Sequence, residues 1–92
     1  NPFWSGATSR FAGNPSTVIS FQLPVSSEMK LAIYNANGQL VRALYSGEMP
    51  AGRFSVVWDG TNEAGMPVAS GVYLYEIKAG TFKAQRRLVL MK

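Results

Sequence analysis

Short runs of alternating apolar and polar residues are the feature that most limits how this chain can fold. In residues 17–23, Ile19, Phe21 and Leu23 fall on one side of an extended chain, and the residues between them fall on the other. This period of two is the spacing of a β-strand, whose successive side chains point to opposite faces of a sheet. No long segment keeps the three-and-four spacing of an amphipathic helix. The chain therefore predicts an all-β fold with no significant helix.

Similar runs recur along the chain, separated by glycine, proline and asparagine. The predicted strands are residues 17–23, 29–35, 39–45, 53–59, 72–78 and 81–91. Asn37-Gly38 and Ala79-Gly80 suit tight turns, and Asn37-Gly38 suggests the positive φ angles of a two-residue hairpin loop. Val41 and Leu44 break the alternation of their strand, which predicts a bulge or a twist there. About seven short strands with such turns are typical of an Ig-like antiparallel β-sandwich.

The apolar side of these runs predicts the core. The main candidates are Ile19, Phe21, Leu23, Leu31, Ile33, Val56, Trp58, Tyr73, Tyr75 and Leu88. A chain of 92 residues suits one small domain, because a second domain would not leave enough apolar surface to bury in either. We therefore expect a single domain spanning residues 1–92.

The residue types that are absent exclude most kinds of catalytic site. The chain has no Cys and no His, so disulfides, thiolate chemistry, Ser-His-Asp triads and the usual zinc sites are ruled out. Its five carboxylate side chains are isolated from one another along the sequence, which gives no local support to a hydrolase with paired carboxylates. We expect a protein that is not an enzyme and that binds no metal and no cofactor.

The apolar content of the chain also bears on its location. No apolar run is long enough to span a membrane, and the start at Asn1-Pro2-Phe3 lacks the charged and apolar regions of a signal peptide. The absence of Cys is compatible with both oxidising and reducing surroundings. Two alternatives remain, a cytosolic protein or a fragment of a longer, exported chain.

A glycine-rich stretch carries Asp59, Asn62 and Glu63, side chains of the kind that bind calcium. A calcium loop places its oxygen ligands at alternating positions, and residues 59–65 do not keep that spacing. Asp and Asn side chains also cap turns, and glycines adopt unusual backbone angles. We interpret the stretch as a connection between strands, in which Pro67 prevents premature strand pairing, and not as an ion site.

The same region carries a family resemblance. Trp58-Asp59-Gly60, followed by Gly65-Met66-Pro67-Val68-Ala69-Ser70-Gly71-Val72-Tyr73, resembles the W-D-G…G-x-P-V-x-S-G-x-Y signature of the Ig-like domain named from the flagellar hook-capping protein FlgD. The signature residues, expected to be structural, are Trp58, Asp59, Gly60, Gly65, Pro67, Gly71 and Tyr73. The wider chain, including Asn14-Pro15-Ser16-Thr17 and the closing Arg86-Arg87-Leu88-Val89-Leu90-Met91-Lys92, is similar to the type A C-terminal sorting domain of the type IX secretion system, which is common in Bacteroidetes.

This resemblance implies a function in protein transport. A sorting domain of this kind directs a larger exported protein from the periplasm through an outer-membrane translocon to the cell surface. The domain would then be noncatalytic, monomeric and covalently linked to an upstream passenger protein, and it would be secreted or displayed on the cell surface. The implied partners are the outer-membrane secretion and surface-attachment machinery, with anionic lipopolysaccharide as a further candidate. No nucleic acid partner is expected.

The chain departs from the family pattern near its start. In the family, Asn-Pro-Phe runs straight into Asn-Pro-Ser-Thr, whereas residues 4–13 (WSGATSRFAG) separate the two motifs here. We interpret residues 4–13 as an insertion that forms a packed loop, because aromatic residues such as Trp4 and Phe11 are more often buried than functional. An extra short strand at the edge of the sandwich and a contact surface are the alternatives.

Positive charge is concentrated at the C-terminal end. Five cations, Lys78, Lys83, Arg86, Arg87 and Lys92, fall within residues 78–92, which contain no Asp or Glu. We take Lys83, Arg86, Arg87 and Lys92 as candidates for recognition by the secretion machinery, since a basic strand attracts an acidic partner. The alternative is that these cations protect an edge strand from aggregation.

Two other kinds of ligand would use parts of the same sequence. Nucleic acid binding needs exposed aromatic residues among the cations, whereas Tyr73 and Tyr75 are expected in the core. Carbohydrate is the better alternative, since Trp4, Tyr34 and Tyr45 are candidates for a sugar-binding platform. A noncatalytic carbohydrate-binding or assembly module appended to a secreted enzyme is therefore the alternative to a sorting domain.

Overall fold

Seven β-strands account for most of the residues that the structure describes. The structure is a computed structural model and describes residues 3–10 and 16–91. The strands are β1 (Trp4–Arg10), β2 (Ser16–Leu23), β3 (Ser27–Asn35), β4 (Leu40–Met49), β5 (Gly52–Trp58), β6 (Gly71–Ala79) and β7 (Phe82–Leu90). These two ranges contain no helix, and so none that is long and apolar enough to cross a membrane. The prediction of an all-β fold is confirmed.

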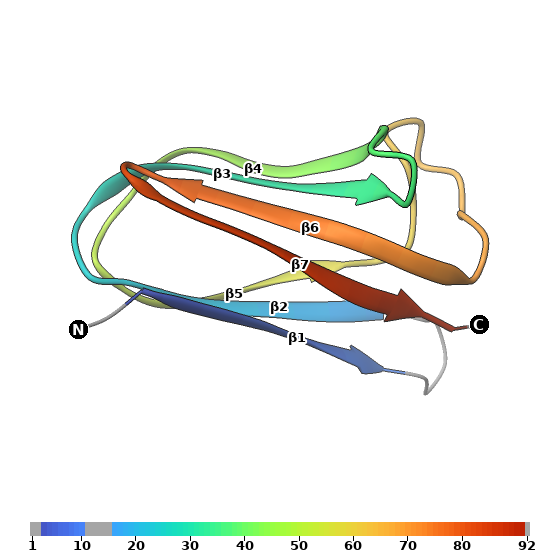
Figure 1. Cartoon of the computed structure of the whole chain (residues 1–92), viewed down its shortest axis with the longest axis horizontal. Helices are drawn as coiled ribbons and strands as arrows, with labels where there is room; N and C mark the ends of the chain where they lie inside the picture. Colours follow the sequence, from blue (N-terminus) through green and yellow to red (C-terminus); the bar gives the residue numbers. More distant parts are fainter. Residues whose placement is uncertain (1–2, 11–15, 92) are drawn as a thin grey trace.

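The strands form two antiparallel sheets that pack face to face (Figure 1). One sheet has the order β1-β2-β5 and the other has the order β4-β3-β6-β7. The β3–β4 and β6–β7 connections are hairpins within one sheet, whereas the β2–β3, β4–β5 and β5–β6 connections cross between the sheets. Figure 1 shows the β3–β4 hairpin and the β5–β6 connection at the same end of the molecule. This arrangement is the Ig-like sandwich that the sequence predicts.

The core lies between the two sheets and follows the period of two. Ile19, Phe21 and Leu23 of β2 are fully buried. The other strands supply the remaining buried apolar side chains, which are Met29, Leu31, Ile33, Val41, Met49, Trp58, Tyr73, Tyr75, Ile77, Ala79, Leu88 and Leu90. Every core candidate from the sequence is buried except Val56. Val56 is only partly buried, although it packs against the core.

Strand β4 bulges twice where it pairs with β3. The register shifts after Leu31 and again after Ile33, which leaves Leu44 and Val41 on β4 without a directly opposite partner. Val41 is buried and Leu44 packs against the core. An extra residue in one strand changes which side chains face inwards, so the bulges bring both apolar side chains to the core. The predicted bulge is confirmed.

The β3–β4 hairpin differs in one detail from the sequence expectation. Gly38 has a positive φ angle of 81°, but no residue other than glycine has a positive φ among the described residues, so a left-handed Asn37 is wrong. The Asn35 side chain explains the difference, because its Oδ1 accepts hydrogen bonds from the N–H groups of Asn37 (3.0 Å) and Gln39 (2.9 Å). These bonds hold a longer loop, in which a single left-handed residue is sufficient.

Residues 4–10 form strand β1, so the expectation of a packed loop for the insertion is wrong there. β1 pairs with β2 along its whole length, from Trp4 opposite Gln22 to Arg10 opposite Ser16. Backbone pairing at a sheet edge tolerates small and polar residues, which is why this strand has no apolar alternation. The alternative of an extra edge strand therefore holds for residues 4–10. Phe11 and the rest of the insertion lie outside the described residues.

Thr17 provides a test of how the core is packed. It is fully buried opposite Trp58, and its hydroxyl has no hydrogen-bond partner among the described residues. Since an unpaired buried hydroxyl is costly, we expect Thr17→Val to raise the free energy of unfolding by up to about 1 kcal/mol. For a domain of this size, that corresponds to an increase of roughly 4–8 °C in the melting temperature.

Thermal unfolding followed by circular dichroism measures this effect. Thr17→Ser is the matched control, because it keeps the hydroxyl and loses the methyl group, and it should lower the melting temperature. A lower melting temperature for Thr17→Val would contradict the prediction, since it would mean that the hydroxyl contributes a favourable bond.

Candidate functional site

The β5–β6 connection, residues 59–70, contains the side chains that raised the question of an ion site. Asp59 Oδ1 accepts hydrogen bonds from the Thr61 N–H (3.1 Å) and the Thr61 hydroxyl (2.5 Å). The Thr61 hydroxyl bond holds the pKa of Asp59 below its usual value, and this effect outweighs the upward shift caused by burial. The Thr61 N–H and the positive charge of Arg42 lower this pKa further. This carboxylate thus acts as an acceptor within its own turn.

Asn62 organises the second half of the connection. Its Oδ1 accepts hydrogen bonds from the N–H groups of Ala64 and Met66, both at 3.0 Å. Its backbone N–H donates to the Met66 carbonyl oxygen at 2.9 Å, and its own carbonyl oxygen accepts from the Gly65 N–H at 2.9 Å. One amide side chain therefore satisfies two backbone donors that would otherwise be left without partners.

Glu63 joins this connection to the edge of β4. Its backbone N–H donates to the Val41 carbonyl oxygen at 3.0 Å, and its Oε1 accepts from the Ala43 N–H at 2.7 Å. Edge strands have unpaired backbone groups that other chains can bind. Glu63 therefore covers part of the β4 edge.

Trp58 and Arg42 anchor the start of the connection. The indole Nε1 of Trp58 donates to the Thr61 carbonyl oxygen at 2.8 Å, and Arg42 Nη1 donates to the Thr61 hydroxyl (3.1 Å) and to the Asn62 carbonyl oxygen (2.6 Å). Trp58 also packs edge-on against Tyr73, with ring centroids 5.2 Å apart. Since Trp58 is fully buried, these bonds tie the loop to the core.

Several other signature residues lie within or beside this network. Gly60 and Gly65 have φ angles of 77° and 78°, in the left-handed region that favours glycine. Pro67 forms an isolated antiparallel bridge with Thr61, so the expectation that it prevents pairing is wrong. The bridge forms because the neighbours of Pro67 make its bonds: the Val68 N–H donates to the Gly60 carbonyl oxygen, and the Met66 carbonyl oxygen accepts from the Asn62 N–H, both at 2.9 Å.

The end of the connection is fixed by Tyr73, whose hydroxyl donates to the Ala69 carbonyl oxygen at 2.6 Å. A tyrosine bonded to the backbone a few residues upstream is typical of Ig-like sandwiches. No cluster of three or more carboxylate side chains lies within residues 3–10 and 16–91. The carboxylate and amide oxygens described above instead accept hydrogen bonds from the chain itself, as in a structural connection.

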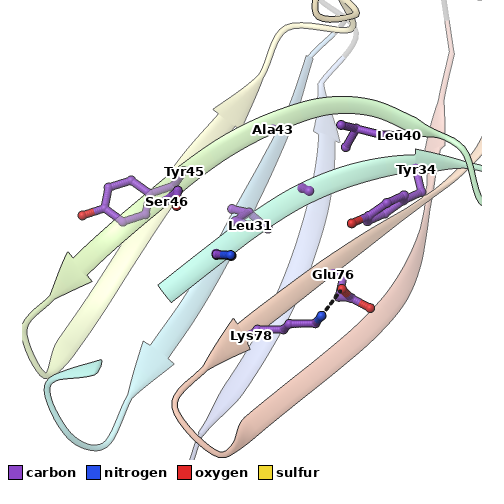
Figure 2. Close-up of a pocket in the computed structure, with 10 residues that line it drawn as sticks. Leu31, Tyr34, Leu40, Ala43, Tyr45, Ser46, Glu76 and Lys78 are labelled. Atoms are coloured by element: carbon purple, nitrogen blue, oxygen red, sulfur yellow. Dashed lines mark ion pairs between the residues drawn. The ribbon is translucent and has the colours of Figure 1, made fainter. Parts of the chain in front are cut away.

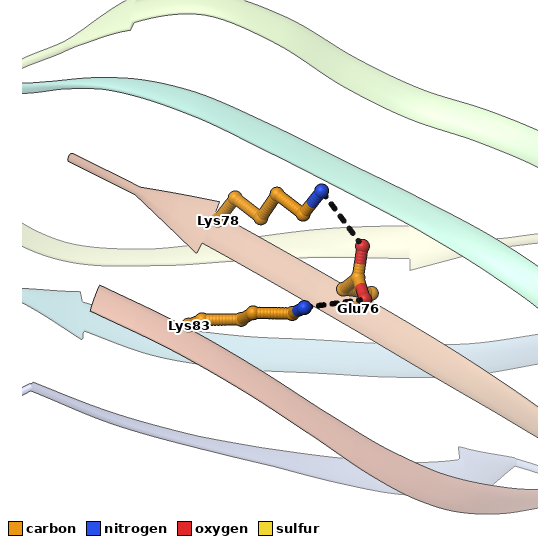
Figure 3. A network of polar contacts seen from close by, with 3 residues as sticks. All are labelled: Glu76, Lys78 and Lys83. Carbon is orange, nitrogen blue, oxygen red and sulfur yellow. Dashed lines mark ion pairs between the residues drawn. The ribbon is translucent and has the colours of Figure 1, made fainter. Parts of the chain in front are cut away.

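The basic residues near the C-terminus do not all lie on one face of their sheet. Lys83 on β7 and Lys78 on β6 both lie close to Glu76, with Nζ to carboxylate oxygen distances of 3.8 and 3.6 Å (Figure 3). Arg87 lies on β7 opposite Leu74 and is exposed. Lys92 lies outside the described residues. The cations on β7 are therefore only partly balanced by Glu76.

Arg86 is directed differently from Lys83 and Arg87. Its Nε donates to the Ser5 hydroxyl oxygen of β1 at 3.3 Å, and the Tyr75 hydroxyl lies 3.1 Å from the same Ser5 oxygen. Phe3 and Phe82 stack with their centroids 5.4 Å apart, so β1 and β7 are in contact at a second point. The described parts of β1 and β7 share no backbone pairing, because each is the edge strand of its own sheet.

The three aromatic residues suggested for a sugar platform do not all lie on the same sheet. Tyr34 and Tyr45 line one groove on the β4-β3-β6-β7 sheet, whereas Trp4 lies on β1 in the other sheet. Gln22 lies opposite both Trp4 and Arg53, and Arg53 Nε donates to Gln22 Oε1 at 2.9 Å. These polar neighbours of Trp4 could not be predicted from the sequence, because cross-strand partners are distant in sequence and depend on the register.

The lowered pKa of Asp59 gives a test of the β5–β6 connection. We expect Asp59→Ala to lower the free energy of unfolding at neutral pH by about 1 kcal/mol, the usual size for a lost hydrogen bond. The ionised Asp59 carboxylate stabilises the fold fully at pH values above the pKa that Asp59 has in the unfolded chain. This contribution is lost as the pH falls through the lower pKa that Asp59 has in the folded protein. The difference between wild type and Asp59→Ala should therefore disappear in acid.

Urea unfolding between neutral pH and pH of about 2 measures this difference. Glu28→Ala is a control, because it removes an exposed carboxylate on β3, away from the β5–β6 connection. A melting temperature that rises when calcium is added, and that no longer does so in Asp59→Ala, would instead identify an ion site.

Comparisons with known protein families and solved structures agree with the Ig-like fold and with the structural character of the β5–β6 connection. The FlgD Ig-like domain family matches residues 6–82, which includes the whole β5–β6 connection but ends before the basic residues of β7. The crystal structure of FlgD from P. aeruginosa is similar, with a TM-score of 0.64 and 28% sequence identity over 82% of this chain. The match spans 58% of that FlgD chain, and no curated protein matches significantly. This chain belongs to the FlgD Ig-like domain family.

Proposed function

We propose that this domain is a noncatalytic C-terminal sorting module, which directs a larger exported protein through the type IX secretion system to the cell surface. The order of motifs along the chain supports the proposal, because the signature in residues 58–73 is followed by a final strand rich in Lys and Arg. The domain would act in the periplasm and at the cell surface as a monomer attached to its passenger protein.

The position of β7 is the observation that carries the proposal. β7 is the edge strand of its sheet and has Lys83 and Arg87 on the face opposite the core residue Leu88. An edge strand offers backbone N–H and C=O groups to a receptor by strand addition, and its cations steer the encounter with an acidic partner. Both features suit recognition of a folded domain by outer-membrane machinery.

A noncatalytic assembly module is the second candidate. The similarity to FlgD favours it, since the family takes its name from the hook-capping protein. An assembly module would bind a structural partner and would not depend on a secretion apparatus. The two candidates therefore differ in whether the domain alone relocates an unrelated protein.

Fusion to a reporter tests the sorting function. Residues 1–92 fused to the C-terminus of a periplasmic reporter should move that reporter to the surface or the medium of a host that has the type IX system. The same fusion in a host without the translocon is the control, and it should remain periplasmic. If the intact fusion also stays periplasmic in the competent host, the sorting function is contradicted.

Charge reversal on β7 tests how the domain is recognised. We expect Arg87→Glu to reduce the exported fraction several-fold, because an unfavourable charge slows association with an acidic receptor. Arg53→Glu is the matched control, since Arg53 is an exposed arginine on β5, an edge strand of the other sheet. Equal export of both variants would contradict recognition through β7, and melting temperatures would exclude a loss of folding.

A further inference from the structure

The outer face of the β4-β3-β6-β7 sheet has a trough that the proposed function does not use (Figure 2). Its floor is formed by Ala43 of β4 and Ala32 of β3, which are cross-strand partners. Because these side chains are small, they leave a depression between two rows of larger side chains. The cavity volume is about 350 Å³. This is close to the lower end of the roughly 300–1,000 Å³ that is typical of sites for small molecules.

One wall of the trough is apolar. It is formed by Leu40 and Tyr34, which are cross-strand partners one row away from the alanine floor. Leu40 is 54% exposed, which is high for a leucine on a sheet, and the Tyr34 hydroxyl has no hydrogen bond within the described part of the chain. Figure 2 shows the hydroxyl end of Tyr34 directed towards the side of the trough where Glu76 lies. The ring and the hydroxyl of Tyr34 are thus both available to a ligand.

The opposite wall is positively charged. Lys30 and Lys78 are cross-strand partners one row away from the floor on the other side, and Ser46 continues this row on β4. Glu76 lies opposite Ala32 and forms an ion pair with Lys78. Lys30 has no ion pair with any residue of the described ranges. Among the lining residues, two lysines and one glutamate leave a net positive charge, and Lys83 of β7 adds to it, so the trough favours an anionic ligand.

We infer that this trough binds one uronic acid unit of an oligosaccharide. The C–H face of the sugar ring packs against Tyr34 and Leu40, as sugars and other amphipathic rings do on apolar side chains. The carboxylate of the sugar pairs with Lys30, and its hydroxyl groups donate to the carboxylate of Glu76. The inference does not depend on the sorting function, because none of these contacts involves the backbone of β7.

Two other classes of ligand fit the trough less well. A phosphate group carries close to two negative charges but has no apolar face, so it would leave the Tyr34 ring and the Leu40 side chain without a contact. A protein partner of ordinary affinity would cover about 800 Å² of this surface. Such an interface would have to bury the whole network of Glu76, Lys78 and Lys83, including Lys83 beyond the trough, and the network loses solvation when it is covered.

Titration with two matched oligosaccharides tests the inference. Trigalacturonic acid should cause saturable chemical-shift changes in the ¹⁵N spectrum of the 92-residue domain, centred on Ala32, Tyr34 and Ala43. The methyl ester of the same trisaccharide keeps the rings and removes the charge, and it should bind several-fold more weakly. Added salt should weaken binding of the acid and leave the ester almost unchanged.

Substitutions in the trough separate its two walls. Tyr34→Ala should lower the affinity for trigalacturonic acid about tenfold, because it removes the aromatic surface. Lys30→Gln should lower it about threefold, which is the size expected for an exposed charge pair. Ala43→Tyr should abolish binding by filling the floor, and it removes none of the proposed contacts. Trp4→Ala and Arg53→Gln, on the outer face of the other sheet, should leave the affinity unchanged.

Three results would overturn the inference. The first is an absence of saturable shift changes with trigalacturonic acid. The second is equal affinity for the acid and its methyl ester. The third is binding that survives both Tyr34→Ala and Ala43→Tyr in variants that melt near the wild-type temperature, since the sugar would then occupy another site.

Discussion

The buried indole of Trp58 is the interaction on which the rest of the structure depends. It closes the core at the end of β5, packs edge-on against Tyr73 of the opposite sheet, and donates its only hydrogen bond to the Thr61 carbonyl oxygen. A buried N–H without a partner is costly, so the chain after Trp58 has to return a carbonyl group to the indole within three residues. This requirement explains why a sharp, glycine-containing turn follows the tryptophan directly, and why the polar side chains of that turn bond to the backbone.

The strands that build the core could be predicted from the sequence, because one face of each is buried and the period of two is therefore visible. The broken alternation at Val41 and Leu44 also gave the position of the bulges correctly, since apolar residues that are out of phase need an extra residue to reach the core. β1 could not be predicted in this way. Most of its residues are small, its apolar residues do not alternate, and it pairs with β2 through the backbone, which leaves no trace in the pattern of hydrophobicity.

The two candidate sites also differ in how far the sequence could predict them. The bonds made by Asp59 and Asn62 are local, within four residues, and the turn chemistry of the sequence was sufficient to suggest them. The trough depends instead on which residues of β4 and β6 lie opposite β3. The two register shifts place Ala43 beside Ala32 and Leu40 beside Tyr34. Without the bulges these neighbours would change, so the trough follows from the same irregularity that completes the core on the inner face.

Glu76 links the trough to β7, because it pairs with Lys78 on one side and with Lys83 on the other. The two lysine side chains are 55% and 62% exposed, and exposed ion pairs contribute only roughly 0.2–1 kcal/mol. A ligand that drew Lys78 away from Glu76 would therefore change the charge around Lys83 very little. Occupancy of the trough and recognition of the β7 edge are thus expected to be almost independent. Such independence would suit the proposed sorting function, since a sorting signal has to be recognised in the same way whether or not the proposed sugar is bound nearby.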